Sequence, residues 1–379
     1  MTDTEAQPIM DAILPHVQRW RLFSLHDPET WQIIERLEDF AAPLLECLWI
    51  STNDIWDKPG GLDLFRDAPR SQELRMCGVS LENCRPPVGS VKTFHFRVTA
   101  WQEWYSFHHF RSMFMDFASL TTLVLQGTVV DVEAEDAESD GWHVDLPLLT
   151  TLVVECRTCL DDYVVALLEA LNVPNLHTLV LHLSDDTEED SEKEWYSDLK
   201  GLAALSPKFG ALQTLHLQSK MSQAFVRPFM KAFPNITTLI LGHMTREFFI
   251  MMHVVGSLSD ESWRRLRTLT IGAIHYPAHS KDGRFIEDVV SFVKSARKGR
   301  RSPVDTVRVG SGIVCQGRPA VRSIRAQLSG AGVTVEEIPE DLDIQYQRLM
   351  KEGEFCEVED VDDESGSGDT DEGALVDLD

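Results

Sequence analysis

Cys156 and Cys159 have the C-x-x-C spacing that pairs two thiols in redox proteins and supplies half of a tetrahedral zinc site. A zinc site needs further ligands, and no second pair follows at zinc-ribbon spacing. The two cysteines also come directly after a predicted strand, at a turn that would bury a small residue. We therefore interpret the pair as structural, and the sequence predicts no metal site.

A second candidate pair of metal ligands is His108 and His109. These histidines lie in a predicted helix, residues 107–117, and large apolar residues such as Phe110 and Phe114 flank them. Histidines in such a helix are more simply explained as packed or surface residues than as ligands.

The remaining motifs offer no catalytic chemistry. Gly310-Ser311-Gly312 begins like a dinucleotide-binding loop, but Cys315 stands where G-x-G-x-x-G requires its third glycine. The motifs G-x-S-x-G, H-E-x-x-H and G-x-x-x-x-G-K-[ST] do not occur in the sequence. Nucleophilic hydrolysis, zinc proteolysis and phosphate binding therefore lack their required residues. We expect a protein that is not an enzyme and that needs no cofactor.

The charge of the chain restricts its partners. The 379 residues include 61 Asp and Glu against 35 Lys and Arg, which gives a net charge of −26. Binding to nucleic acid needs a clustered positive surface, so this balance argues against it and favours basic or neutral protein partners. Acidic residues are concentrated in two inserts, 131–140 and 185–190, which we expect to form solvated loops, and in the C-terminal tail.

The sequence gives no sign of export or of a membrane helix. Residues 1–20 carry acids where a secretory signal has basic residues, and the most apolar stretch, 248–258, falls short of the roughly 20 residues that span a bilayer. The seven cysteines are odd in number and scattered, which is typical of a reducing compartment. We expect a monomeric protein that is cytoplasmic and/or nuclear. The basic run 294–301 is either an import signal or a charged helix end.

The strongest signal is a short pattern that recurs along the chain: an apolar residue, two residues, an apolar residue, one residue, and an apolar residue. Most copies follow one another at close to the 20–29 residues of a leucine-rich repeat, and a weaker twelfth copy lies near residues 330–335. The other eleven copies, of which the one at Ser71 is degenerate in its first position, begin at Trp20, Leu45, Ser71, Val91, Leu120, Leu149, Leu176, Leu212, Ile236, Leu266 and Val304.

Each copy predicts a short strand, because its fourth and sixth residues lie two apart and so share one face. Segments with helical apolar spacing, such as 163–171 and 285–293, lie between the strands. A single unit cannot bury its apolar face, so the units must stack into one continuous core. The predicted fold class is α/β: a leucine-rich-repeat-type solenoid with 11 or 12 strands, a curved parallel β-sheet on the concave side and helices on the convex side.

This pattern also predicts how the chain is divided. Residues 1–19 are expected to form an N-terminal helix or cap, residues 20–340 the solenoid, and residues 341–351 a C-terminal helical cap. Residues 352–379, with 13 acidic and no basic side chains, are expected to be a disordered and solubilising tail.

A threonine precedes the second apolar position in eight successive copies, which indicates a register shared by the whole array. High sheet propensity is the simplest explanation of this column. The threonines are Thr93, Thr122, Thr151, Thr178, Thr214, Thr238, Thr268 and Thr306.

The same register places a second column of residues on the concave face. The residues at the centre of this column are apolar, and we expect them to be exposed to water. We hypothesise that this column and a polar column beside it form the centre of a protein-binding surface. The alternatives are that the column reflects only sheet propensity, or that the acidic tail covers it. The apolar column contains Val124, Val153, Val180, His216 and Ile240, and the polar column contains Gln126, Glu155, His182 and Gln218.

Several segments resemble fungal F-box leucine-rich-repeat proteins: 19–25 (RWRLFSL), 41–50 (AAPLLECLWI), 65–79 (FRDAPRSQELRMCGV) and 171–176 (LNVPNL). The similarity covers roughly residues 10 to 340. In that family an F-box docks on the Skp1–cullin ubiquitin ligase core and the repeats hold the substrate. An F-box-like L-P-x-E-I/L segment is not evident in this sequence. The resemblance therefore implies two alternatives: a protein-binding scaffold, or a substrate-recognition subunit whose F-box is missing or supplied elsewhere.

Overall fold

The computed structural model describes most of the chain between residues 3 and 338. The described residues are 3–26, 31–38, 40–52, 61–65, 67–79, 81, 84–98, 105–131, 143–156, 161–183, 208–218, 226–242, 263–272, 284–298, 304–311, 313–315 and 318–338.

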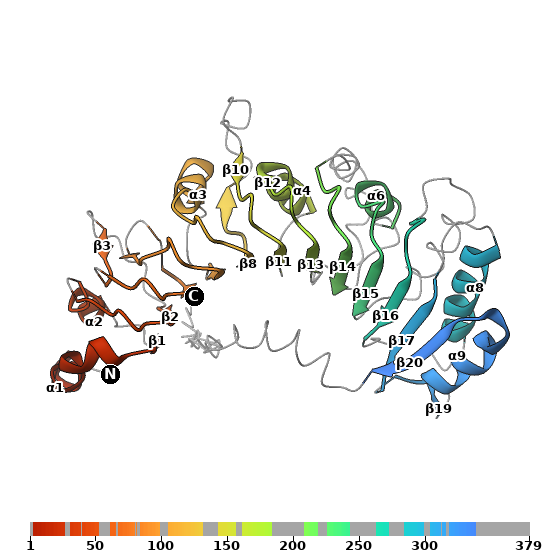
Figure 1. The fold of residues 1–379 in the computed structure, drawn as a ribbon, viewed down its shortest axis with the longest axis horizontal. Coiled ribbons are helices and arrows are strands. Elements are labelled where there is room, and N and C mark those ends of the chain that lie inside the picture. The colour runs from red at the N-terminus through yellow and green to blue at the C-terminus, as the bar shows by residue number, and fades with distance from the viewer. Residues whose placement is uncertain are drawn as a thin grey trace, which may run out of the picture.

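A single parallel sheet of 12 strands organises the molecule, and its strands lie side by side in chain order (Figure 1). This confirms the prediction of 11 or 12 parallel strands in a repeat-type α/β fold. In order, the strands are β1 (Leu22–His26), β2 (Cys47–Ser51), β4 (Glu73–Cys77), β6 (Thr93–Arg97), β8 (Thr122–Gln126), β11 (Thr151–Cys156), β13 (Thr178–Leu183), β14 (Thr214–Gln218), β15 (Thr238–Gly242), β16 (Thr268–Ile271), β17 (Thr306–Gly310) and β20 (Thr334–Ile338).

Helices and shorter strand pairs occupy the connections between these strands. The helices are α1 (Asp3–Ile13), η1 (Leu14–Arg19), α2 (Trp31–Glu35), α3 (Phe107–Phe114), α4 (Asp161–Ala170), α6 (Val226–Ala232), α8 (Arg284–Lys298), α9 (Ala320–Leu328) and η5 (Ser329–Ala331). The short pairs are β3 (Leu62–Asp63) with β5 (Cys84–Arg85), β7 (Tyr105–Ser106) with β9 (Val130–Asp131), β10 (Val144–Asp145) with β12 (Leu171–Asn172), and the antiparallel β18 (Val314–Cys315) with β19 (Arg318–Pro319). The helices predicted at 163–171 and 285–293 are present, and the one predicted at 107–117 ends earlier, at Phe114.

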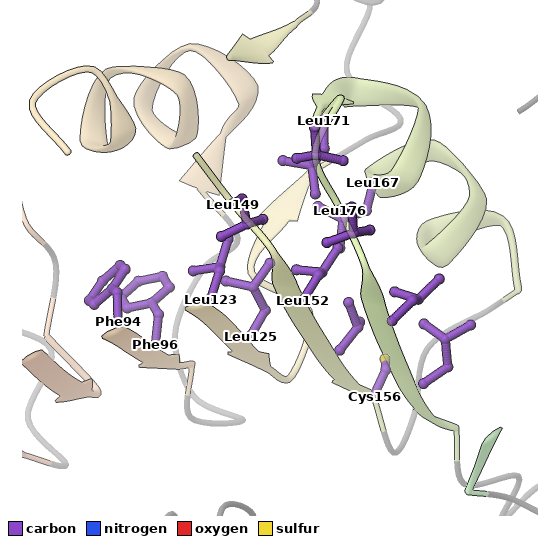
Figure 2. Close-up of a cluster of buried hydrophobic side chains, with 14 of the residues drawn as sticks. Phe94, Phe96, Leu123, Leu125, Leu149, Leu152, Cys156, Leu167, Leu171 and Leu176 are labelled. Carbon is purple, nitrogen blue, oxygen red and sulfur yellow. The ribbon is translucent and has the colours of Figure 1, made fainter. Parts of the chain in front are cut away.

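The repeated apolar positions form the core. Leu123, Leu152 and Leu179 occupy the same position in β8, β11 and β13, and each is fully buried. Figure 2 shows Leu123 and Leu152 beside Leu149 and Leu176, with Leu167 of α4 packed against this layer. Burial of one such side chain contributes about 1.5–3 kcal/mol, so the stacked layers supply the main stabilising term.

Side-chain hydrogen bonds from one repeated position join three pairs of neighbouring repeats. We call the residue directly before the first apolar residue of each copy the ladder position. At this position Ser119 donates to the carbonyl of Gly89 at 3.1 Å, and Asn175 donates to the carbonyl of Pro147 at 2.8 Å. Asn235 makes the equivalent bond to Gly210 at 3.3 Å. Each bond satisfies a carbonyl of the preceding turn and helps to fix the spacing between repeats.

Candidate protein-binding face

The structure places the predicted column residues next to one another. Val124, Val153, Val180, His216 and Ile240 are aligned partners in the neighbouring strands β8, β11, β13, β14 and β15. The threonines precede them in the same register and form a continuous column from Thr93 to Thr334, including one threonine that the sequence pattern did not identify. We call this side of the sheet the threonine face.

The expectation that the apolar column lies in water is wrong for its centre. Val124, Val153 and Val180 are only 0%, 3% and 2% exposed, and they form a hydrophobic cluster separate from the main core. His216 is also buried, whereas Ile240 is half-buried. Strand pairing explains part of this burial, because aligned side chains on adjacent strands stand about 4.8 Å apart and shield one another.

The polar column contains an internal network. The Nε2 atom of Gln126 donates to Oε2 of Glu155 at 2.7 Å, and Nδ1 of His182 lies 3.7 Å from Oε1 of the same carboxylate. Glu155 is buried, so these contacts compensate for the cost of removing a carboxylate from water. Gln218, the next residue in this column, is half-buried.

Two histidines of the middle column are buried in their neutral form. Burial lowers the pKa of His216 to about 4, and the neighbouring His182 lowers it further in the same direction. Burial likewise lowers the pKa of His95 to about 3, with Arg75 adding to the effect. At neutral pH these imidazoles therefore contribute no positive charge to the face.

The arginines at the ends of the middle column are neutralised by neighbouring glutamates. The Arg75 guanidinium lies 4.3 Å from the centre of the Trp49 ring, and its Nε donates to Glu73 at 2.7 Å. Towards the other end, Nε of Arg308 donates to Glu336 at 2.9 Å. The charges of Arg75 and Arg308 are therefore compensated locally, although the whole chain carries −26.

The accessible side chains at the centre of the face, in β13, β14 and β15, are neutral. Ile240, His182 and Gln218 are half-buried, as are the threonines of the column from Thr93 to Thr306. We call these residues the open strip. Hydroxyl, amide and imidazole groups beside an aliphatic side chain provide both hydrogen bonds and apolar contact.

The other candidate sites do not assemble into reactive centres. His108 and His109 are exposed on α3. Gly310 has a structural role, because a Cβ atom there would collide with the carbonyl oxygen of Gly272. Within the described ranges there is no group of three or more His, Cys, Asp or Glu that could hold a metal ion.

The oxidation state of Cys156 differs from the expectation that the scattered cysteines are reduced. Cys156 is buried at the end of β11 and forms a disulfide bond. Cys47, Cys77 and Cys84 form no disulfide bond, and burial raises the pKa of Cys84. Composition alone could not distinguish the bonded cysteine from the free ones.

Several predicted features lie outside the described residues. They are Cys159, most of the acidic insert 131–140 and all of 185–190, the apolar stretch 248–258, residues 299–301 of the basic run, the cap 341–351 and the tail 352–379.

The fold places the chain in the class of repeat-type α/β proteins built on one long parallel sheet. Comparison with models of known protein families and with curated protein sequences finds no match to this chain. None of the helices in the described part is both long enough and apolar enough to cross a membrane.

Proposed function

We propose that the protein is a leucine-rich-repeat-type solenoid that binds a protein partner on its threonine face and has no catalytic activity of its own. The observation that most directly supports this proposal is the register shared by the 12 strands, which presents one continuous face across the whole sheet. In Figure 1 the row of strands bends, with α3, α4 and α6 along its outer side, and this supports a threonine face that is concave. A concave face of this kind is the surface that solenoid proteins commonly use for binding.

The chemistry of the open strip indicates the kind of partner. Its accessible groups are hydroxyl, amide, imidazole and aliphatic, and the charged residues Arg75 and Arg308 are already paired with glutamates. Such a surface favours a partner that contributes neutral hydrogen-bonding groups and apolar side chains, as at the centre of many protein interfaces. The pairing of Arg75 and Arg308 with glutamates disfavours a polyanionic partner.

The buried residues have a different role in this proposal from the one expected from the sequence. Val124, Val153, Val180 and His216 form the floor of the face, and Ile240, His182 and Gln218 make the contacts. The Glu155 carboxylate, which accepts a hydrogen bond from Gln126, lies 3.7 Å from His182 and helps to orient it.

A substrate-recognition role in a ubiquitin ligase of the Skp1–cullin–F-box type is the second candidate. Its support is the sequence resemblance in segments such as 19–25 and 41–50. This candidate uses the same binding face, and it differs in requiring ligase subunits among the bound proteins.

A glutamine-to-arginine substitution, made once on the threonine face and once on α9, tests the proposal. Gln218→Arg introduces a long cation into the open strip, whereas Gln327→Arg introduces one on the exposed surface of α9. Proteins recovered with each tagged variant from native extract would be quantified by mass spectrometry against the unmodified chain. We expect a partner to be lost with Gln218→Arg and retained with Gln327→Arg. Equal recovery with both variants would contradict binding at this face, and recovery of Skp1 and a cullin would establish the ligase role.

A further inference from the structure

Two large apolar side chains remain exposed around one cavity. Met115 is 76% exposed and Leu148 is 51% exposed, and both line a cavity of about 300 Å³. In the described part of the chain only two other large apolar residues, Ile9 and Leu22, are comparably exposed. Single exposed apolar residues are normal on protein surfaces. Two of them at the rim of one cavity, however, form an exposed apolar patch, whose contact with water is unfavourable.

The cavity lies between the end of α3 and the turn that leads into β11, and its wall is largely apolar. Phe114, Phe117, Leu120 and Leu146 are buried side chains of the lining, so the floor of the cavity is part of the main core. The rings of Phe114 and Phe117 are 5.7 Å apart. A preformed apolar cavity of this size is suited to one large side chain rather than to an extended ligand.

Leu148 departs from the hydrogen-bond ladder of the fold. It occupies the ladder position, where Ser119 in the preceding repeat and Asn175 in the following repeat both donate to a carbonyl of the repeat before them. The equivalent acceptor for Leu148 would be the carbonyl of Ala118, which belongs to a residue of the cavity lining. Leu44 and Ala211 occupy the same position in other repeats, but both are half-buried, whereas Leu148 leaves apolar surface in water, and this exposure distinguishes it.

The surroundings of the cavity are negative. Asp145 lines the cavity and Asp116 follows Met115, and both are exposed. Neither carboxylate forms an ion pair with another described residue, although Oδ1 of Asp145 accepts a hydrogen bond from Asn172 at 2.6 Å. The C-terminal end of α3, capped by Met115, adds the negative end of a helix dipole on the same side.

We propose that this cavity is a second docking site, which holds one large apolar side chain of a protein segment that carries lysine or arginine next to it. The apolar side chain enters between Met115 and Leu148, and the adjacent cations pair with Asp116 and Asp145. The charge of −26 would attract such a segment from a distance. This site does not depend on the threonine face, because its lining comes from α3, the residues after it and the turn before β11.

Three labelled peptides test the proposal by fluorescence anisotropy with the full chain. The first has a central tryptophan flanked by lysines, the second has glutamates in place of the lysines, and the third has serine in place of the tryptophan. We expect only the first to bind, and we expect added salt to weaken its binding. The methyl resonance of Met115, assigned by its loss in Met115→Leu, should shift during the titration with the first peptide.

Leu148→Asn separates binding from folding. An asparagine at this position is placed to restore the ladder bond to Ala118, as Asn175 does in the next repeat. We therefore expect an unchanged or higher unfolding midpoint together with at least a ten-fold loss of affinity for the lysine–tryptophan peptide. Asp116→Asn should weaken binding and flatten its salt dependence. Ile9→Asn, which removes an exposed apolar residue on α1, is the matched control and should leave binding unchanged.

The proposal is overturned if no peptide binds, if the glutamate peptide binds as tightly as the lysine peptide, or if Leu148→Asn binds with unchanged affinity. Because none of these variants touches the open strip, loss of partner binding with Gln218→Arg would not affect this result.

Discussion

Replacing His216 with valine is expected to make the protein less sensitive to acid. In the folded chain burial lowers the pKa of His216 from 6.5 to about 4, with His182 nearby, whereas the unfolded chain has the ordinary value. The unfolded state therefore binds the proton more readily, and stability falls as the pH drops from 6.5 towards 4. For these two pKa values the loss between pH 7.5 and pH 5 is about 2 kcal/mol.

Valine suits this position because His216 is aligned with Val180 on one side and Ile240 on the other. The free energy of unfolding would be measured by urea denaturation at both pH values for the wild type and for His216→Val. Acidic residues titrate over the same range in both proteins, so the difference between them isolates the histidine. The control His177→Val removes an exposed histidine from the preceding repeat.

We expect His216→Val to lose about 2 kcal/mol less than the wild type on acidification, and the control to behave like the wild type. If wild type and His216→Val lose the same free energy between the two pH values, His216 is not buried as a neutral imidazole. The description of the threonine face would then be wrong at its centre.

Two further predictions concern the stability of the array. Leu152→Ala removes a fully buried side chain from β11 and should lower the free energy of unfolding, measured by urea denaturation, by about 2–5 kcal/mol. Leu148→Ala, at an exposed position, should change it by less than about 0.5 kcal/mol. Similar values for both variants would contradict the core described here. Lys208→Met should destabilise the protein by about 1 kcal/mol, because Nζ of Lys208 donates to the last carbonyls of α4, at 3.0 Å to Leu168 and more closely to Glu169. Hydrogen exchange should then accelerate in α4, and unchanged exchange there would show that this cap is dispensable.

The strand register could be predicted from the sequence because one residue type marks it. Thr122, Thr151 and Thr178 each precede the same apolar position, and alignment of these threonines aligns every other column of the sheet. The last strand, β20, was only weakly indicated because Glu337 stands where the other strands carry a second buried apolar residue.

Burial on the threonine face could not be predicted in the same way. Alternation along a strand shows which side a residue faces, but it does not show how closely the neighbouring columns crowd it. Val124 and Ile240 have the same place in the pattern, yet one is fully buried and the other half-buried.

The ladder position was missed because its signal is distributed among different residue types. Ser119 and Asn175 look like ordinary turn residues in the sequence, and only their shared acceptor, a carbonyl of the preceding repeat, reveals a common role. Leu148 stands out among the apolar residues at this position only by its exposure, which the sequence does not show. This is why the cavity beside it could not be found from the motif pattern alone.

The central claim, that a protein partner binds the open strip, is tested most directly by site-specific photo-crosslinking. A benzophenone side chain would replace Ile240 on the threonine face or, in a separate variant, Gln327 on α9, and the chain would be irradiated in native extract. We predict a discrete covalent adduct from position 240 and none from position 327. Adducts from position 327 alone, or from neither position, would contradict the claim.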